Sequence, residues 1–485
     1  MTTPIQPVTI VIFGASGDLT WRKLVPALYN NFKKGRLQEC NHIIGVARRP
    51  MSDIDFKDHL KEGVTSFTPG TFSAETWQAF SERLTYIQGN LTIQKDYLRL
   101  AKQLDQIETH PSNRLYYLAT APEFYPGIVE HLGAAKLARH ETGWRRIVIE
   151  KPFGSDLASA RKLNNAVHKV FHEDQVYRID HFLGKETAQN ILFFRFANTI
   201  FEPVWNRRYV NNIQISVLES VDVGHRAGYY DQAGILRDMF QNHLLQLLAL
   251  IAMEPPSSFK AESLRNEKIK VLESIRPIPL KDTVLGQYLG YRQTQGVPMD
   301  SHTATYAALK LYIDNWRWQG VPFYLRSGKA LKDKTSEIII EFQRPPHLMF
   351  DYPDPVRFMP NVLSLSIQPD EGIHLQFEAK QPDSEQDMTP VDMDFHYTDV
   401  FKGELPEAYE RLLLEALQGD ASLFTRSDMI EAAWGLIDPL IQGWTGAEDS
   451  RLSFYPSGSW GPMEAEALLE QEGRHWRTGM ERLHG

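Results

Sequence analysis

Cysteine is almost absent from this 485-residue sequence, in which Cys40 is the single example. One thiol cannot form a disulfide within the chain, and such usage is expected of a protein in a reducing compartment. The sequence has no CxxC pair and no Cys/His cluster, so it offers no structural zinc site. A chain of this length can instead bury a large apolar core, and we expect that core to stabilise it.

Positive charge is not in excess either. The sequence has 52 Lys and Arg against 61 Asp and Glu, which gives a formal net charge of −9. A mildly acidic chain is a poor candidate for broad nucleic-acid binding, although a local basic pocket stays open as an interpretation. We therefore expect no nucleic-acid partner.

Long hydrophobic runs and a signal peptide are missing as well. The longest apolar stretch, Leu244–Met253, has about half the length that a bilayer-spanning helix needs. The apolar run Thr9–Phe13 follows no basic region and ends at a glycine turn rather than at a cleavage site. Hydrophobic residues make up 42% and charged residues 23% of the chain, as in ordinary folded proteins. We expect a soluble, cytoplasmic protein that does not bind membranes.

Short apolar runs alternate with helical patterns in the first third of the sequence. The residues Leu19–Phe32 have the spacing of a helix. Such alternation is typical of βαβ units, which form a parallel sheet that helices cover on both faces. A sheet of this kind binds its ligand beyond the carboxyl ends of its strands, where the topology switches. The expected strands are Thr9–Phe13, Ile43–Ala47, Arg114–Ala119 and Arg146–Ile149.

The pattern changes after about Gln175, where strands no longer alternate regularly with helices. Long helices are expected at Gly234–Met253 and Ala408–Gln418, and Gly286–Asp300 has the composition of a linker. These features predict an α+β domain with a large, mainly antiparallel sheet. Its expected strands are Asn212–Leu218, Thr303–Asn315, Ile338–Gln343, Leu363–Gln368 and His374–Ala379.

A glycine turn joins the first expected strand to the first expected helix. Glycines at such a turn let the backbone approach a pyrophosphate, and the helix start supplies N–H donors. The spacing differs from the full GxGxxG pattern, so a tight turn without a ligand is the alternative. The order strand, turn, helix, strand favours a dinucleotide site. The turn has the sequence Gly14-Ala15-Ser16-Gly17-Asp18-Leu19.

The second expected strand ends at Ala47 and is followed by Arg48 and Arg49. A site for NAD would place an acid here to hold the ribose 2′-hydroxyl, whereas an arginine suits a 2′-phosphate. The residues therefore favour NADP over NAD, and two solvated surface arginines are the alternative.

Two charged clusters follow later expected strands. The segment Glu150–Gly154 begins directly after a strand, on the edge of the sheet where a ligand is expected. Further along, Asp180, His181 and Lys185 lie within six residues, and the His and Lys could both donate to one phosphate dianion. A surface ion pair in the first case and a polar loop in the second are the alternatives.

His243 lies in a strongly apolar helical stretch, where Met239, Phe240 and Leu247 are its neighbours at helical spacing. A polar ring is costly to bury there unless it has a partner. Most such histidines are satisfied core residues. With a carboxylate partner, however, the ring could act as a general base, because imidazole exchanges a proton near neutral pH.

Cations also gather after the run Pro322–Arg326, where Lys329, Lys332 and Lys334 follow within a few residues. Several positive charges at one strand end suit an anionic substrate. A solvated charged loop is the alternative.

Taken together and in this order, these segments closely resemble the glucose-6-phosphate dehydrogenase family. The resemblance spans almost the whole chain and implies a Rossmann-like NADP-binding domain over residues 1–177. It implies a second, α+β domain for substrate binding and dimerisation over residues 178–485, and a homodimer or homotetramer. The matching segments are Gly14–Leu19, Glu150–Gly154, Arg178–Glu186, Phe196–Trp205, Arg237–His243 and Leu325–Lys329.

The resemblance implies oxidation of D-glucose 6-phosphate at C1 to 6-phospho-D-glucono-1,5-lactone with hydride transfer to NADP+, the first step of the oxidative pentose phosphate pathway. No metal is implied. His243 would be the general base, with Asp180 as its carboxylate partner. The 6-phosphate and the sugar would be bound by His181, Lys185, Lys151, Glu219, Asp238, Lys329 and Lys334. The cofactor would lie along Gly14, Ser16, Gly17, Asp18, Leu19, Arg48, Tyr117 and Lys151.

Two residues depart from the family pattern. Phe182 stands where the family usually has Tyr, which removes one hydrogen bond to the phosphate. Lys334 lies near a position that is often Arg, so a bidentate phosphate contact is weakened. Both departures bear on substrate affinity more than on the class of reaction.

Two other interpretations stay open. An enzyme of the glucose–fructose oxidoreductase type would accept non-phosphorylated sugars, and it does not predict the cluster of Asp180, His181 and Lys185. A non-enzymatic NADP-sensing module would leave His243, Asp180 and the lysines without a role.

Overall fold

The computed structural model describes residues 7–37, 40–108, 112–139, 143–349, 359–401, 405–446 and 452–478. The chain forms two compact units, and each is built from more than one stretch of sequence. Within the described residues, no helix is both long and apolar enough to span a bilayer. Unit 1 comprises Met1–Lys185, Pro256–Asn266 and Pro406–Glu431, and unit 2 comprises Glu186–Pro255, Glu267–Leu405 and Ala432–Gly485.

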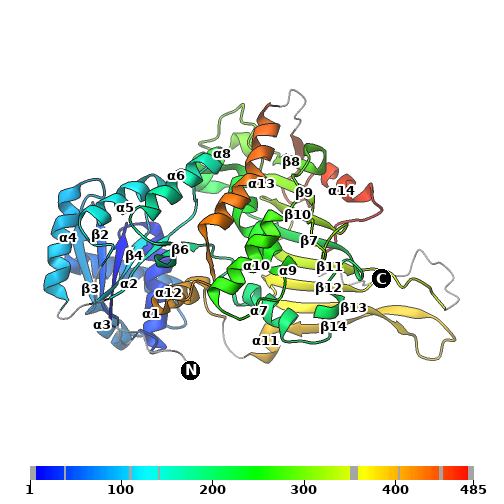
Figure 1. Ribbon diagram of the computed structural model, residues 1–485, viewed down its shortest axis with the longest axis horizontal. Coiled ribbons are helices and arrows are strands. Elements are labelled where there is room, and N and C mark those ends of the chain that lie inside the picture. Colours follow the sequence, from blue (N-terminus) through cyan, green and yellow to red (C-terminus); the bar gives the residue numbers. More distant parts are fainter. Residues whose placement is uncertain are drawn as a thin grey trace. The chain divides into compact units, whose positions relative to one another are not determined.

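Unit 1 contains a seven-stranded sheet (Figure 1). Along the sheet the strands follow one another as β15 (Phe424–Thr425), β6 (Val176–Ile179), β5 (Arg145–Ile149), β4 (Asn113–Leu118), β1 (Val8–Phe13), β2 (Cys40–Ala47) and β3 (Leu84–Gln88). All neighbours are parallel except β15 and β6. The order reverses at β1, which lies between β2 and β4, so the expected ligand position is at the carboxyl ends of these strands.

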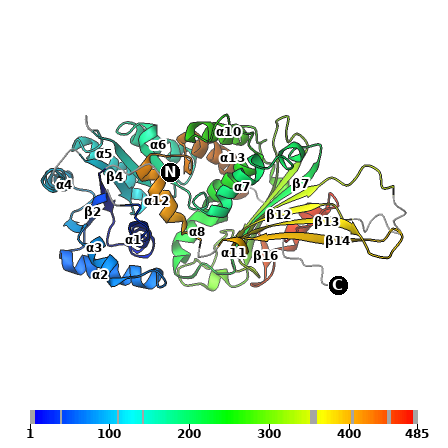
Figure 2. The same ribbon diagram turned by 90° about the horizontal axis from the view of Figure 1, so that it is seen from below.

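Helices cover both faces of this sheet (Figure 2). One face carries α1 (Val25–Lys33), α2 (Asp53–Phe67), α3 (Ala74–Ser81) and α12 (Ala408–Gln418), and the other carries α4 (Gln94–Ile107), α5 (Tyr125–Ala134) and α6 (Leu157–His168). Strands β1 and β4 are buried along their whole length, as expected of a sheet packed on both sides. The predicted parallel sheet covered by helices is therefore confirmed.

The helix α12 comes late in the chain but packs in unit 1. Its residues Leu412 and Leu413 belong to the same buried cluster as Ile10 and Leu28. The side chain of Asn31 also donates a hydrogen bond to the carbonyl of Glu410 over 2.8 Å. The predicted helix Ala408–Gln418 is confirmed. The domain boundary expected between residues 177 and 178 stays a prediction, and unit 1 extends to Lys185.

Unit 2 contains a nine-stranded sheet. Its order is β14 (Met388–His396), β13 (Gly372–Lys380), β12 (Val362–Gln368), β11 (Thr335–Phe342), β7 (Val210–Leu218), β10 (Pro322–Gly328), β9 (Tyr306–Tyr312), β8 (Thr283–Tyr288) and β16 (Ser453–Tyr455). Only the pairs β7–β10 and β16–β8 are parallel among these described strands. The predicted large, mainly antiparallel sheet is confirmed.

The remaining α-helices of the described chain are α7 (Glu186–Phe196), α8 (Ala227–Ile235), α9 (Leu245–Ala252), α10 (Ala261–Glu273), α11 (Tyr397–Val400), α13 (Ser427–Gly446) and α14 (Met463–Glu470). Two π-helices are present in the described chain, η1 (Thr20–Leu24) and η6 (Leu236–Leu244). Short 3₁₀ turns occur at Pro122–Phe124, Glu173–Gln175, Glu202–Val204, Gly224–Arg226, Leu280–Asp282 and Tyr291–Gln293.

Two predictions about the second half of the chain were wrong in part. The helix expected over Gly234–Met253 is interrupted at its start, because Gly234 has φ +67° and the chain then forms η6 before α9. A period of 3.6 residues does not distinguish a π-helix from an α-helix over so short a stretch. The linker expected at Gly286–Asp300 begins inside β8, where Gly286 pairs with Tyr306.

Candidate active site

A cavity of about 300 Å³ opens at the carboxyl ends of β1, β2 and β4 in unit 1. Four of the residues predicted to bind a cofactor line it, namely Gly14, Ser16, Gly17 and Arg48. The remaining lining residues are Ala47, Arg49, Asn90, Leu91, Ala119, Thr120 and Phe124. The position is the one expected for the ligand of a doubly wound sheet.

Gly14 could not be another residue without displacing its neighbours. Its φ is +87°, and a Cβ atom added there would lie 2.2 Å from the carbonyl oxygen of Ala119. Its N–H donates to the carbonyl of Val46 over 2.9 Å, and its own carbonyl accepts from the N–H of Gly17 over 2.9 Å. The turn is thereby pinned between β2 and β4, and its bare backbone faces the cavity.

The turn leads directly into helix. Asp18 is exposed and forms an ion pair of 3.7 Å with Arg22, one turn further on. Leu19 packs against the apolar core of unit 1 and precedes η1. Arg48 and Arg49 follow β2 as exposed side chains, so two cations stand at the rim of the cavity.

Sequence reasoning missed several lining residues. Asn90 and Leu91 follow β3, and Thr120 and Phe124 follow β4. The signal that could have found them is their place after strands adjacent to β1 and β2, but the strand β3 was not predicted. Ordering the strands is what turns such positions into a site.

Tyr117, also predicted to lie along the cofactor, is fully buried on β4 and is not among the residues that line this cavity. Its hydroxyl donates to Oε1 of Glu150 over 2.5 Å. Burial raises the pKa of Glu150, while hydrogen bonds from Tyr117 and Tyr409 and the charge of Lys151 lower it. Burial raises the pKa of Tyr117 well above its usual value, and the nearby Glu150 carboxyl adds to the effect. Lys151 is half-buried at the carboxyl end of β5.

Asp180, His181 and Lys185 lie in a series of turns at the end of the first stretch of unit 1. Asp180 directly follows β6, is 2% exposed, and its Oδ1 accepts from the N–H of Phe182 over 3.0 Å. The carbonyls of Asp180 and His181 accept from the N–H groups of Leu183 and Gly184 over 3.0 and 3.2 Å. These bonds fix the backbone that carries the three predicted side chains.

Phe182 packs beside both of the predicted phosphate ligands. Its ring centroid lies 5.1 Å from that of His181 and 4.7 Å from Nζ of Lys185. The phenyl ring is buried and carries no hydroxyl, so the contact that a tyrosine would add at this position is absent from this side chain.

In unit 2 the parallel pair β7–β10 brings Glu219 and Lys329 to one edge. Their preceding residues, Leu218 and Gly328, are partners in the ladder, and the N–H of Glu219 donates to the carbonyl of Gly328 over 2.9 Å. Nζ of Lys329 donates to Oε2 of Glu219 and lies 3.9 Å from Oδ2 of Asp238. Three residues predicted to bind the sugar, Glu219, Asp238 and Lys329, therefore form one group at the edge where the parallel strands end. We call this group the acid–lysine cluster.

Tyr230 belongs to the same cluster but was not predicted. Nζ of Lys329 lies 5.0 Å from the centroid of its ring. Burial raises the pKa of Tyr230 well above its usual value, and the carboxylate of Asp238 raises it further. No local pattern marks this tyrosine in the sequence, because it lies on α8, before the break at Gly234.

His243 lies on η6 and is 1% exposed. The backbone N–H of His243 donates to Oδ1 of Asn242 over 2.6 Å. A π-helix widens the backbone by one residue per turn and is frequent at functional sites. Lys334 is exposed just before β11, and its contact with the phosphate stays a prediction. Asp180 belongs to unit 1 and His243 to unit 2, and their pairing stays a prediction.

Comparison with known proteins covers nearly the whole chain. The model of the "Glucose-6-phosphate dehydrogenase, NAD binding domain" family matches residues 11–190, and that of the "Glucose-6-phosphate dehydrogenase, C-terminal domain" family matches residues 192–477. The "Glucose-6-phosphate 1-dehydrogenase" of Aggregatibacter actinomycetemcomitans is 45% identical over 96% of this chain and 97% of its own. That of Chlamydia pneumoniae is 44% identical over 97% of this chain and 96% of its own.

A solved structure is similar over the full length. The structure described as "Glucose-6-phosphate dehydrogenase in complex with its substrate glucose-6-phosphate" superposes with a TM-score of 0.90. It is 36% identical and covers 99% of this chain and 100% of that chain. A second, from Mycobacterium avium, has a TM-score of 0.87 and 37% identity, with 98% of both chains covered.

Proposed function

Because the chain belongs to the glucose-6-phosphate dehydrogenase family, we propose that it oxidises D-glucose 6-phosphate at C1 to 6-phospho-D-glucono-1,5-lactone with NADP+ as the hydride acceptor. This reaction is the first step of the oxidative pentose phosphate pathway. The observation that carries the proposal is that a chain matching both domains of the family has a glycine-lined cavity in unit 1 and an acid–lysine cluster in unit 2.

The cavity in unit 1 fits a phosphorylated dinucleotide. Gly14 has no side chain and a φ of +87°, which lets the turn pass close to Ala119 and line the cavity with bare backbone, as suits a ligand that contacts backbone N–H groups. Arg48 is exposed at the rim and suits a 2′-phosphate. When bound, NADP+ supplies a nicotinamide ring that accepts a hydride. The residues proposed to hold it are Gly14, Ser16, Gly17, Asp18, Leu19, Arg48, Tyr117 and Lys151.

The proposed proton acceptor is His243. Oxidising a hemiacetal carbon removes a proton from its oxygen as the hydride leaves, and a neutral imidazole can take that proton. Asp180 is proposed to fix the tautomer of the ring and to stabilise the imidazolium. Since these residues belong to different units, the proposal requires both units to present side chains to one substrate. The burial of His243 supports the role, because a site closed to bulk water does not leak the proton that the base accepts.

The proposed sugar site uses the cluster in unit 2. Lys329, Glu219 and Asp238 offer one donor group and two carboxylates, which suits a polyol with several hydroxyls. Lys151 is proposed to contact both sugar and cofactor. His181 and Lys185 are proposed to hold the 6-phosphate, with Lys334 as a further cation. A grip on the phosphate holds C1 in place although it lies far from the reacting bond.

We also propose that the protein is a cytoplasmic homodimer or homotetramer, formed through the sheet of unit 2. On β13 and β14 the apolar residues Leu375, Phe377, Val391 and Met393 share one face, because Leu375 pairs with Met393 and Phe377 with Val391. None of them is fully buried in one chain, and Met393 is 62% exposed. An uncovered apolar sheet face favours a second copy.

The oligomer is tested by size-exclusion chromatography with light scattering. The expected mass is that of two or four chains, and Met393→Asp should lower it. Met463→Asp is the matched control, because Met463 is also exposed but lies on α14. A monomeric mass for the unmodified protein contradicts the proposal.

The reaction is tested by absorbance at the reduced-nicotinamide band. Glucose 6-phosphate and glucose are each assayed with NADP+ and with NAD+. Turnover with glucose 6-phosphate and NADP+ is the expected result. Turnover of glucose alone would favour an oxidoreductase for free sugars, and nicotinamide binding without turnover would favour a sensing module.

A further inference from the structure

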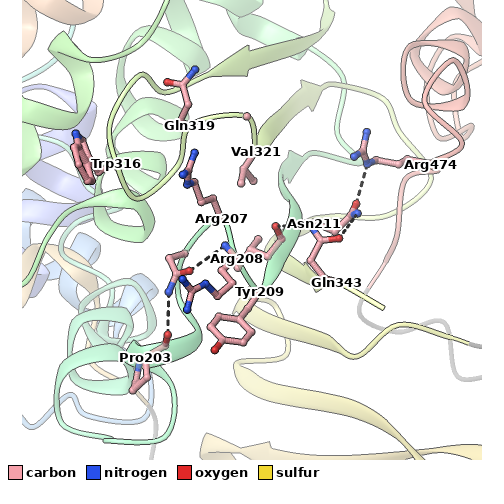
Figure 3. A pocket seen from close by; sticks show the side chains of 13 residues that line it. Pro203, Arg207, Arg208, Tyr209, Asn211, Trp316, Gln319, Val321, Gln343 and Arg474 are labelled. Atoms are coloured by element: carbon pink, nitrogen blue, oxygen red, sulfur yellow. Dashed lines mark hydrogen bonds between the residues drawn. The ribbon is translucent and has the colours of Figure 1, made fainter. Parts of the chain in front are cut away.

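A second and larger cavity lies in unit 2, away from every residue assigned above. Its volume is about 810 Å³. It is lined by the loop before β7, the loop before β10, the residue after β11 and the C-terminal segment (Figure 3). Because β7 and β10 are parallel, their amino ends share an edge of the sheet, whereas Glu219 and Lys329 follow their carboxyl ends. The cavity is therefore at the opposite end of these strands from the proposed sugar site.

The wall of this cavity is cationic in an acidic protein. Arg207, Arg208 and Arg474 line it, and none of the described lining residues is an Asp or a Glu. The whole chain has 61 acidic and 52 basic residues, so a concave wall without a carboxylate departs from the overall balance. A hollow of one charge sign concentrates ligands of the other sign.

The arginines are prepared for a ligand to different degrees. Arg474 is already held, since Nε donates to Oδ1 of Asn211 over 3.0 Å and the guanidinium also contacts Glu472. Arg207 and Arg208 are exposed, and within the described part of the chain their guanidinium groups have no hydrogen-bond or ion-pair partner.

Their backbones, in contrast, are fixed. The N–H of Arg207 donates to the carbonyl of Arg317 over 2.8 Å, and the N–H of Arg208 donates to Oδ1 of Asn206 over 3.0 Å. Guanidinium groups on two consecutive residues of a fixed backbone offer N–H donors that suit phosphate oxygens.

Two exposed aromatic side chains accompany the positive charge. Trp316 is 98% exposed and Tyr209 is 42% exposed, and both line the cavity (Figure 3). Leaving an indole in water forgoes the stabilisation that burial would give. An exposed indole offers a flat face on which a nucleobase can stack.

We propose that this cavity binds a nucleoside di- or triphosphate, with phosphates on Arg207 and Arg208 and the base on Trp316. The volume lies within the range of about 300–1,000 Å³ typical of small-molecule sites. Its concave form favours a small molecule over a flat protein partner. The site is independent of the proposed reaction, and it recognises phosphate and base chemistry together, so inorganic polyphosphate should bind more weakly than the nucleotide.

Binding is tested by photolabelling the full chain with 8-azido-ATP and mapping the labelled peptides by mass spectrometry. Label within residues 203–211 or 316–321, competed by ATP and less effectively by tripolyphosphate, is the expected result. Label confined to peptides of the cavity in unit 1, or no label that ATP competes, overturns the proposal.

Variants test which residues bind the phosphates of the nucleotide and which residue binds its base. Arg207→Ala/Arg208→Ala should weaken competition by both ATP and tripolyphosphate at least tenfold. Trp316→Ala should weaken competition by ATP several-fold and leave competition by tripolyphosphate unchanged. Lys61→Ala/Lys102→Ala removes the same charge from an exposed surface of unit 1 and should change neither. Equal competition in the arginine variant and in this control overturns the proposal.

Dehydrogenase activity separates this site from the proposed reaction. The Arg207→Ala/Arg208→Ala and Trp316→Ala variants should keep the kcat and KM of the unmodified protein, because neither contacts the residues assigned to the sugar or the dinucleotide. Dehydrogenase activity without labelling by 8-azido-ATP would contradict the nucleotide site alone. Labelling without dehydrogenase activity would contradict the proposed reaction alone. A fall in kcat/KM of more than threefold in these variants contradicts a separate site.

Discussion

The imidazole of His243 lies on a helix beside Met239 and Phe240, both of which are buried. If this ring is the base, His243→Asn keeps a polar group near the position of Nδ1 but removes the proton acceptor. We expect the variant to fold and to bind glucose 6-phosphate, and kcat to fall by about two to four orders of magnitude. Steady-state kinetics and equilibrium binding measure the two effects separately.

His302→Asn is the matched control, because His302 is an exposed histidine of unit 2. It should retain full turnover. Near-normal kcat in His243→Asn would remove the histidine from the role of base.

Lys185 illustrates a residue whose loss should affect binding more than chemistry. Its ammonium group lies beside the ring of Phe182 and is proposed to hold the 6-phosphate. Removing one charge-assisted hydrogen bond costs about 1.5–3 kcal/mol, which corresponds to roughly a ten- to hundredfold change in affinity. We expect Lys185→Ala to raise KM for glucose 6-phosphate by that factor while kcat changes less than threefold, with the exposed Lys61→Ala as control. An unchanged KM would place the phosphate elsewhere.

Among the elements, the turn after β1 has the least freedom. In Gly14→Ala the new methyl group would lie 2.2 Å from the carbonyl oxygen of Ala119, at a φ of +87°. The strained backbone alone costs about 1–3 kcal/mol, and relief of the clash must move the turn away from β4. We expect a lower midpoint of thermal unfolding and at least tenfold weaker NADP+ binding, measured by calorimetry and by fluorescence titration.

Gly127→Ala provides the control for a glycine without such a constraint. Gly127 lies on α5, and a Cβ atom there would meet nothing within 4 Å. The change should stabilise the helix by about 0.5–1 kcal/mol and leave NADP+ affinity unchanged. Equal behaviour of the two variants would mean that the turn does not contact the cofactor.

Elements with a strong local pattern could be predicted from the sequence. The apolar run Thr9–Phe13 became β1, and Ala408–Gln418 became α12 with the predicted bounds, because each pattern has one period and clear ends. The helix over Gly234–Met253 failed where the backbone changes its geometry, at Gly234 and along η6. Local periodicity does not encode that change, since it depends on how the helix packs.

Site residues show the same division. Gly14, Gly17 and Arg48 could be found because they directly follow two predicted strands, β1 and β2. Asn90, Thr120 and Tyr230 could not, since their place depends on strand order and on packing between distant segments. The grouping of Glu219 with Lys329 came from family resemblance, and its physical cause is the parallel pairing of β7 with β10.

At the scale of the whole molecule, each of the two units contains several buried tyrosines. Burial raises the pKa of Tyr116 and Tyr117 in unit 1 and of Tyr230 in unit 2, and it raises the pKa of Tyr306 to about 12. Such phenols stay protonated in the folded protein while the unfolded chain ionises from about pH 10. The unfolded state then binds fewer protons, so the tyrosine contribution to stability falls as pH rises above 10.

We therefore expect the urea midpoint to fall steeply above pH 10, and only slightly between pH 8 and 9, where the thiol of Cys40 contributes because burial raises its pKa to about 12. Each buried tyrosine contributes about 1.4 kcal/mol per pH unit until its folded-state pKa is reached. Tyrosinate absorbance at 295 nm should rise together with unfolding rather than before it. Tyr306→Phe should make the fall less steep, whereas Tyr209→Phe, at an exposed position, should not. Complete tyrosine ionisation at pH 10.5 with an unchanged midpoint would mean that these rings are open to solvent, and would contradict the buried cores from which the fold is built.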